Sequence, residues 1–185
     1  MRTTILCLVG ALLLAACSKA PATSGANAAA PPAPAAPPTA PSAAAPAPAF
    51  TGAAVSGAFT ANGKAATLTQ VTAHKDDPFD DKPITAIVFT SKDQGDDDKA
   101  ATKALFGDYG DAIVARVEPD GTLVGADVVH SGLKEKGSVS ISGVFKIEGY
   151  SAANGQISGH LTSNGPTDVF DQKVDVDLTF HAKAP

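Results

Sequence analysis

Residues 174–180, Val-Asp-Val-Asp-Leu-Thr-Phe, decide the fold class of this chain. Apolar and polar side chains alternate at every position, and a period of two places them on opposite faces of a β-strand. The same alternation occurs in residues 139–147 and 157–161. One face of each strand is therefore predicted to lie in a core and the other in solvent, as is common in antiparallel sheets.

Working outward from this stretch, short apolar runs alternate with turn residues over the C-terminal part of the chain. The predicted strands are approximately 54–61, 64–75, 84–91, 111–118, 122–130, 138–148, 156–163 and 169–182. Tight turns are predicted at Asn62-Gly63, Pro119-Asp120-Gly121 and Asn154-Gly155, because Asn and Gly tolerate the positive φ of hairpin turns. The predicted fold is all-β, a single antiparallel β-barrel or β-sandwich of about eight strands.

Two of these strands differ from the rest. Residues 84–91 and 111–118 are apolar on both faces, so we expect them at the centre of a sheet or beneath the connection between them. That connection is predicted to hold one short helix, capped within residues 96–98 and ended by Gly107.

An element with the pattern apolar-Ser-Gly-x-apolar occurs three times, at residues 55–59, 141–145 and 157–161. Its glycine shares the inward face with the flanking apolar residues, and an inward glycine marks a bend or the close approach of another group. We therefore predict that a ring or a facing backbone lies close to the central glycine of each copy. Three bends of this kind favour a closed or nearly closed sheet over a flat sandwich. The three glycines are Gly57, Gly143 and Gly159.

The N-terminus has the parts of a secretory signal. A positive start at Arg2 is followed by an apolar run from Ile5 to Ala16, which ends at Cys17. The run is shorter than the roughly 20 residues that span a bilayer. Residues 1–16 are therefore predicted to be a signal peptide. The competing interpretation, a plain signal with Ala-x-Ala cleavage, gives no reason for a thiol at the start of the mature chain.

The stretch Leu14-Ala15-Ala16-Cys17 resembles a bacterial lipobox. The resemblance implies a lipoprotein that is cleaved before Cys17 and carries a diacylglyceryl thioether and an amide-linked acyl chain (such as palmitate) on that residue. Several acyl chains together anchor a protein stably in a membrane. By the same resemblance, Ser18 in place of Asp implies the outer membrane of a Gram-negative bacterium. Residues 57–64 and 174–180 are similar to small uncharacterised β-rich lipoproteins of Proteobacteria. This resemblance implies a location in the cell envelope but no biochemical activity.

Residues 17–52 are predicted to be the lipidated N-terminus and a disordered linker rich in Ala and Pro. Dense prolines remove backbone donors and push the preceding residues to extended conformations. About 30 such residues reach roughly 90 Å when extended. We predict a spacer that holds a β domain, residues 53–185, away from the membrane. The alternatives are a segment that crosses the peptidoglycan or docks a partner.

Composition argues against several classes of function. The net charge is −5 and the lysines are scattered, which argues against a nucleic-acid partner. Of the two cysteines, Cys7 lies in the predicted signal and Cys17 in the predicted lipid anchor, so the domain lacks a thiol for a disulfide or a metal. The chain has no tryptophan and is 5% aromatic, which argues against a sugar-binding face of stacked rings.

Neither carboxylates nor histidines show a metal-binding spacing. Two acidic loops could supply oxygen ligands for calcium, but they lack the EF-hand spacing and flank opposite ends of the strand 84–91, so solvated loops are favoured. Zinc spacing is also absent, which favours surface histidines. His160 and His181 are predicted on the outward face with Asp175 and Asp177, close together if their strands pair. The acidic residues are Asp76, Asp77, Asp80, Asp81, Asp93, Asp96, Asp97 and Asp98, and the other histidines are His74 and His130.

The sequence therefore predicts a non-enzymatic cell-envelope lipoprotein whose β-domain is a binding or structural module, with no cofactor. Its expected partners are the membrane, through lipid on Cys17, and an envelope protein. The first alternative is a periplasmic carrier or sensor with a small ligand in the mouth of a β-barrel. The second is a hydrolase, although the chain has no Gly-x-Ser-x-Gly motif.

Overall fold

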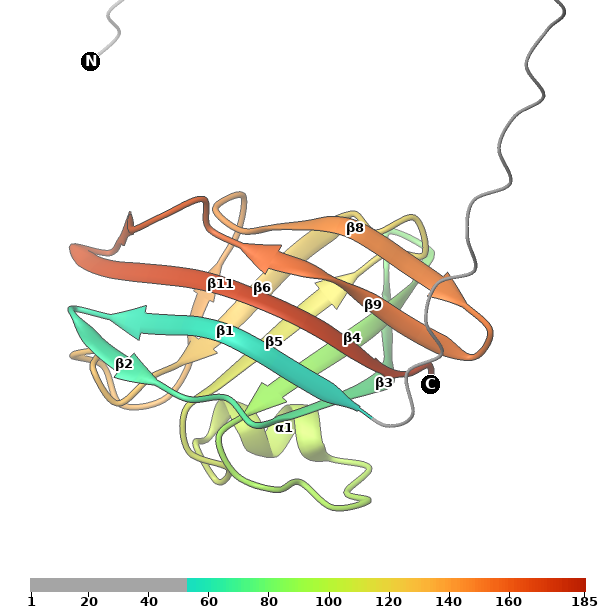
Figure 1. Ribbon diagram of the computed structural model, residues 1–185, viewed down its shortest axis with the longest axis horizontal. Helices are drawn as coiled ribbons and strands as arrows, with labels where there is room; N and C mark the ends of the chain where they lie inside the picture. Colours follow the sequence, from blue (N-terminus) through green and yellow to red (C-terminus); the bar gives the residue numbers. More distant parts are fainter. Residues whose placement is uncertain (1–52) are drawn as a thin grey trace, which may run out of the picture. The chain divides into compact units, whose positions relative to one another are not determined.

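The computed structural model describes residues 53–185, which form two antiparallel sheets and one short helix (Figure 1). One sheet has the order β2-β1-β11-β9-β8, with β10 also paired to β11, and the other has the order β3-β4-β5-β6-β7. The elements are β1 (Ala54–Ala61), β2 (Lys64–Ala66), β3 (Gln70–Phe79), β4 (Lys82–Thr90), α1 (Ala100–Leu105), β5 (Ala112–Val117), β6 (Leu123–Val129), β7 (Val139–Ile141), β8 (Lys146–Ala153), β9 (Gln156–Thr162), β10 (Thr167–Val169) and β11 (Gln172–Lys183).

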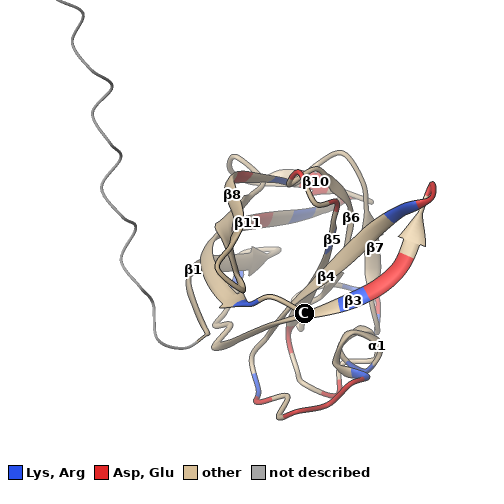
Figure 2. Cartoon of the chain, turned by 90° about the vertical axis from the view of Figure 1, so that its right-hand side faces the viewer, with Lys and Arg blue, Asp and Glu red and all other residues tan. Residues whose placement is uncertain are grey.

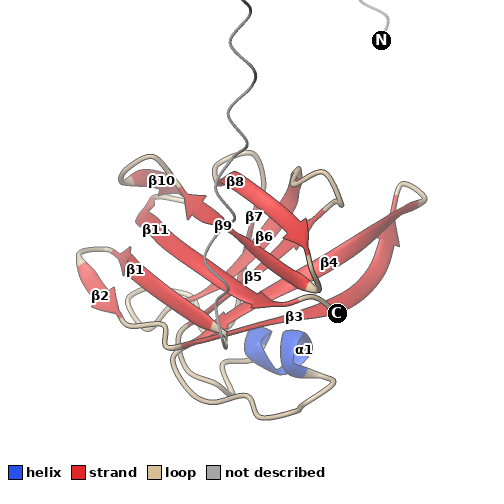
Figure 3. Ribbon diagram, turned by 45° about the vertical axis from the view of Figure 1, so that its right-hand side comes forward, coloured by secondary structure: helices blue, strands red, loops and turns tan. Residues whose placement is uncertain are grey.

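The predicted all-β class is confirmed, and of its two alternatives the sandwich describes the molecule. The sheets lie face to face in two layers (Figure 3). The predicted signal peptide, the predicted lipid site Cys17 and the predicted linker lie outside the described residues. Within residues 53–185, no helix is both long and apolar enough to cross a membrane.

The core lies between the two sheets and consists of the inward-facing residues that the alternation predicts. In β11 the inward positions Val174, Val176, Leu178 and Phe180 are each at most 2% exposed. Phe180 meets Phe89 of β4 edge to face, with ring centroids 5.3 Å apart. This ring pair joins the two sheets directly, and such pairs add to the stability gained by burial.

Beneath α1, the outer face of the second sheet is also apolar, as predicted for the strands now identified as β4 and β5. The helix α1 lies against this face (Figure 3). Its fully buried Ala104 packs there with Val88 and Val114. The helix was predicted at this place, but its N-cap is Lys99, which makes no side-chain cap hydrogen bond. Asp97 binds the start of the helix in another way, because its Oδ1 accepts the backbone N–H of Lys99 at 2.9 Å.

Three predicted strands are each divided in two. Residues 64–75 separate into β2 and β3, and β3 continues to Phe79. Residues 169–182 belong to β10 and β11, which a turn with positive φ at Phe170 and Asp171 separates. Residues 138–148 leave one sheet as β7 and enter the other as β8. Alternation continues across this last break because both inner faces border the same core, so periodicity alone does not reveal it.

The glycine prediction is confirmed at two of its three positions. A Cβ on Gly57 would collide with the carbonyl oxygen of Asp177, and one on Gly159 would lie 3.2 Å from Cζ of Phe180. The prediction is wrong for Gly143, where a Cβ would meet nothing within 4 Å. Gly143 lies between β7 and β8, where the chain crosses between the sheets with a φ of +73°. The expected preference for a closed sheet is also wrong, because the strands form two separate sheets that pack as a sandwich.

Candidate functional site

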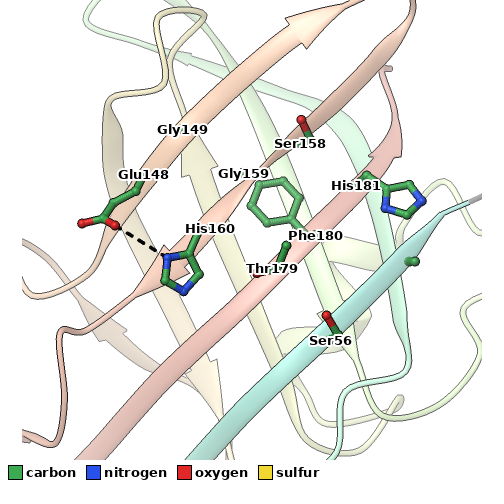
Figure 4. Close-up of a pocket in the computed structure, with 10 residues that line it drawn as sticks. Ser56, Glu148, Gly149, Ser158, Gly159, His160, Thr179, Phe180 and His181 are labelled. Carbon is green, nitrogen blue, oxygen red and sulfur yellow. Dashed lines mark ion pairs between the residues drawn. The ribbon is translucent and has the colours of Figure 1, made fainter. Parts of the chain in front are cut away.

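The candidate site is a shallow depression of about 510 Å³ on the outer face of the six-stranded sheet (Figure 4). It lies over β1, β8, β9 and β11. Inward residues of these strands fill the core, so most of the residues around the depression are the outward ones. The depression exists because several outward residues are small, namely Ala54, Ser56, Gly149 and Ser158.

Strand register places four polar groups of three chemical kinds side by side. Ser56 of β1 lies opposite Thr179 of β11, and Thr179 lies opposite His160 of β9. His160 in turn lies opposite Glu148 of β8. Because all four residues point outward, they form one row of hydroxyl, hydroxyl, imidazole and carboxylate across the sheet (Figure 4).

His160 is held between two carboxylates. Its Nε2 lies 2.8 Å from Oδ1 of Asp177, and its Nδ1 lies 3.7 Å from Oε2 of Glu148. Glu148 also pairs with Lys146 at 2.5 Å. The hydrogen bond and charge of Lys146, with a smaller effect of His160, hold the pKa of Glu148 below its usual value. The hydrogen bond to Asp177 therefore orients the imidazole, with Glu148 on its other side.

The hydroxyl groups of the depression are free to bind a ligand. Within residues 53–185, the side chains of Ser56, Ser158 and Thr179 make no hydrogen bond, although each lines the depression. A hydroxyl is both a donor and an acceptor. Ser158 of β9 lies opposite His181 of β11, so this hydroxyl also has an imidazole as its cross-strand neighbour.

An irregularity in β8 shapes one side of the depression. Its register with β9 shifts between Glu148 and Ser151, and Gly149 within the bulge has a φ of +60°. Bulges bend an edge strand and redirect its side chains. Here the bulge leaves Glu148 on the outer face while Tyr150 packs against the core, where burial raises the pKa of its phenol.

The sequence predicted part of this site. The outward placement of His160 and His181 with Asp175 and Asp177 is confirmed. Pairing of β9 with β11 brings both histidines to one depression. The sequence did not reveal Ser56 or Glu148, because their strands join the site only through long-range register. The one sequence signal that could have selected them is their position on the outward face in the alternation of their predicted strands.

The remaining histidines lie elsewhere, and one of them contradicts the prediction of surface positions. His130 is 3% exposed, at the end of β6, and packs edge to face on Phe59 at 4.5 Å. Its Nδ1 accepts the backbone N–H of Gly132 at 2.8 Å. Burial lowers its pKa, an effect that the nearby carboxylate of Asp111 and the backbone of Phe59 partly oppose. His74 is half-buried and hydrogen bonds to Thr72 at 2.8 Å.

The acidic loops lie at opposite ends of β4, as expected (Figure 2). Some of their carboxylates bind other side chains, since Asp76 pairs with Arg116 at 2.9 Å and Asp97 pairs with Lys103 at 2.6 Å. Lys103, Tyr109 and the N–H of Lys99 keep the pKa of Asp97 well below its usual range. In the described part of the chain, no three His, Cys, Asp or Glu side chains are placed to hold one metal ion.

The depression can bind polar groups, but His160 is not arranged as a general base. A base that activates a hydroxyl must lie within hydrogen-bond reach of it. Both ring nitrogens of His160 instead face carboxylates, those of Asp177 and Glu148. The arrangement favours recognition through hydrogen bonds and charge.

Comparison with known proteins gives no relative for this chain. No protein-family model matches it, and neither curated proteins nor solved structures contain a significant match.

Proposed function

We propose that the chain is a non-enzymatic cell-envelope lipoprotein, held by lipid on Cys17 in the outer membrane of a Gram-negative bacterium. Its β-sandwich is a binding module, and its partner is an envelope protein that contacts the depression around His160. The observation that carries this proposal is the position of the depression, which lies on an outer sheet face and brings hydroxyl, imidazole and carboxylate groups together. The lipobox-like stretch Leu14-Ala15-Ala16-Cys17 supports the address.

The filled interior favours a surface-binding module over a small-ligand carrier. A carrier of the β-barrel type holds its ligand among the inward side chains. Here Phe59, Phe89 and Phe180 occupy the space between the sheets and are each at most 2% exposed. A hydrolase gains no support from the contacts of His160 with Asp177 and Glu148.

The sheet edges favour a partner that docks on a face over one that adds a strand. Exposed edge strands invite pairing unless they are short, charged or bulged. The edge strands β2 and β7 have three residues each. The longer edges β3 and β8 each contain a bulge, and both carry charged side chains.

The predicted anchor can be tested by metabolic labelling of the full chain with an alkyne-bearing palmitate in a Gram-negative host. We expect label on the wild-type chain and on Cys7→Ser, and none on Cys17→Ser. Cys7→Ser is the matched control because it removes the other thiol of the chain. Equal labelling of Cys17→Ser would refute the lipid anchor.

The binding face can be tested by photo-crosslinking in intact envelopes, with a photoreactive residue at Thr179 in the depression or at Lys99 as an exposed control. We expect one adduct of defined mass from Thr179 and none of that mass from Lys99. Ser158→Arg fills the depression and should abolish the adduct. An adduct that persists in Ser158→Arg, or forms equally from Lys99, would contradict the assignment of this face.

A further inference from the structure

A second depression, of about 560 Å³, lies among three connections of the sandwich and shares no residue with the one around His160. Its walls come from the segment after β4, the segment between α1 and β5, and the segment after β6. Lys92, Lys134 and Lys136 line it, together with the carboxylates Asp111 and Glu135. Lysines therefore outnumber carboxylates here, in a chain whose net charge is −5.

The two carboxylates of this depression bind neutral donors. Asp111 accepts the backbone N–H of Ser131 at 2.5 Å and its hydroxyl at 3.4 Å. Glu135 accepts a hydrogen bond from the side-chain amide of Gln172. Neither carboxylate forms a salt bridge with a lysine of the depression, so the ammonium groups keep their capacity to bind an anion.

These three lysines differ from five other cations of the described residues, which pair with carboxylates. Within residues 53–185, Lys92, Lys134 and Lys136 form no salt bridge. Ammonium groups that no carboxylate contacts directly remain available to attract an anion. The cations that do pair with carboxylates are Lys82, Lys103, Arg116, Lys146 and Lys173.

Backbone hydrogen bonds hold two of the three lysines in place. Lys92 donates its N–H to the carbonyl of Tyr109 at 3.1 Å. Lys134 donates its N–H to Oε1 of Gln172 at 2.6 Å. A site whose backbone is ordered before binding loses less entropy when the ligand arrives.

We propose that this depression binds a phosphate-bearing anion with two or more negative charges. Lysine suits this ligand because the ammonium is a compact point charge that binds phosphate without a fixed planar geometry. Three ammonium groups suit a ligand with several charged oxygens, such as a phosphate, better than they suit a ligand with a single carboxylate. The phosphate can belong to a free solute or to a phosphomonoester lipid headgroup, since both present the same chemistry.

The test uses the full chain, labelled with ¹⁵N, in micelles of a zwitterionic detergent at low ionic strength. Sodium pyrophosphate is titrated in one arm, and phosphatidic acid replaces part of the detergent in the other. The variant Lys92→Gln/Lys134→Gln/Lys136→Gln removes the site. Its matched control is Lys75→Gln/Lys99→Gln/Lys183→Gln, which removes three exposed lysines that also form no salt bridge within the described residues.

We expect saturable amide shifts within residues 91–92, 107–111 and 131–137, in at least one arm. The site variant should weaken binding about tenfold or more, because it removes several charge-assisted contacts. The control should stay within about twofold of the wild type, as screened surface charges contribute little. Shifts with pyrophosphate assign a free solute, and shifts with phosphatidic acid alone assign a lipid. No saturable shift in either arm, or equal weakening in both variants, would overturn the proposal.

Discussion

Gly159→Ala tests whether the strand glycine is required by close packing. A Cβ at this position would lie 2.8 Å from Cγ2 of Ile147 and 3.2 Å from Cζ of Phe180. Phe180 is 2% exposed and rests on Phe89, so its ring cannot retreat freely. Overpacking of this kind costs about 1–3 kcal/mol. Loss of the glycine's freedom in the unfolded chain offsets about 0.4–1 kcal/mol.

We therefore expect Gly159→Ala to lower the free energy of unfolding by about 1.3 kcal/mol, the difference between the midpoints of these two ranges. Urea denaturation followed by far-ultraviolet circular dichroism measures this change, provided that the m-value stays constant. The matched control is Gly125→Ala in β6, where a Cβ would meet its nearest atom at 3.6 Å. Without a close contact, that variant should be neutral or slightly more stable.

A double-mutant cycle identifies the cause of the loss. Ile147→Ala removes the Cγ2 that the new methyl group would meet, so Gly159→Ala should cost less in that background. Neighbouring residues typically show coupling of about 0.5–3 kcal/mol. If Gly159→Ala matches Gly125→Ala in stability, or if Ile147→Ala leaves its cost unchanged, the close-packing explanation of this glycine is refuted.

Two further perturbations test buried polar groups. Because burial lowers the pKa of His130, the unfolded state binds more protons, and stability should fall as the pH drops below about 6.5. The urea midpoints at pH 7.5 and pH 5.5 should therefore differ less in His130→Gln than in the wild type, and an equal difference in both would contradict this explanation. Arg116→Gln leaves the 7% exposed Asp127 with the hydroxyl of Ser140 and should cost about 1–3 kcal/mol, whereas Lys173→Gln, at an exposed pair, should cost under about 0.5 kcal/mol. Equal losses in these two variants would show that the burial of Asp127 is irrelevant.

Local signals in the sequence were sufficient to predict turns at which one or two residues favour the required backbone conformation. Asn62-Gly63 and Asn154-Gly155 form their predicted turns, with φ values from 50° to 78°. The turn at Phe170-Asp171 has the same positive φ at both positions but carries no glycine. Tertiary contacts of the flanking strands must hold such a turn, since Phe and Asp adopt this conformation at a cost. The sequence therefore gives no local sign of it.

The candidate sites lie beyond local signals for a related reason. Alternation states which residues of a strand face outward, and it placed His160 and His181 correctly. It does not state which strands become neighbours, and the row from Ser56 to Glu148 needs three separate pairings of strands. Each pairing is fixed by burial of the opposite face, because a slip of one residue would expose the core positions of a whole strand. The apolar residues of the sandwich thus determine which polar residues become neighbours on the outer face. A prediction that identifies the apolar residues but not the strand register cannot identify those neighbours.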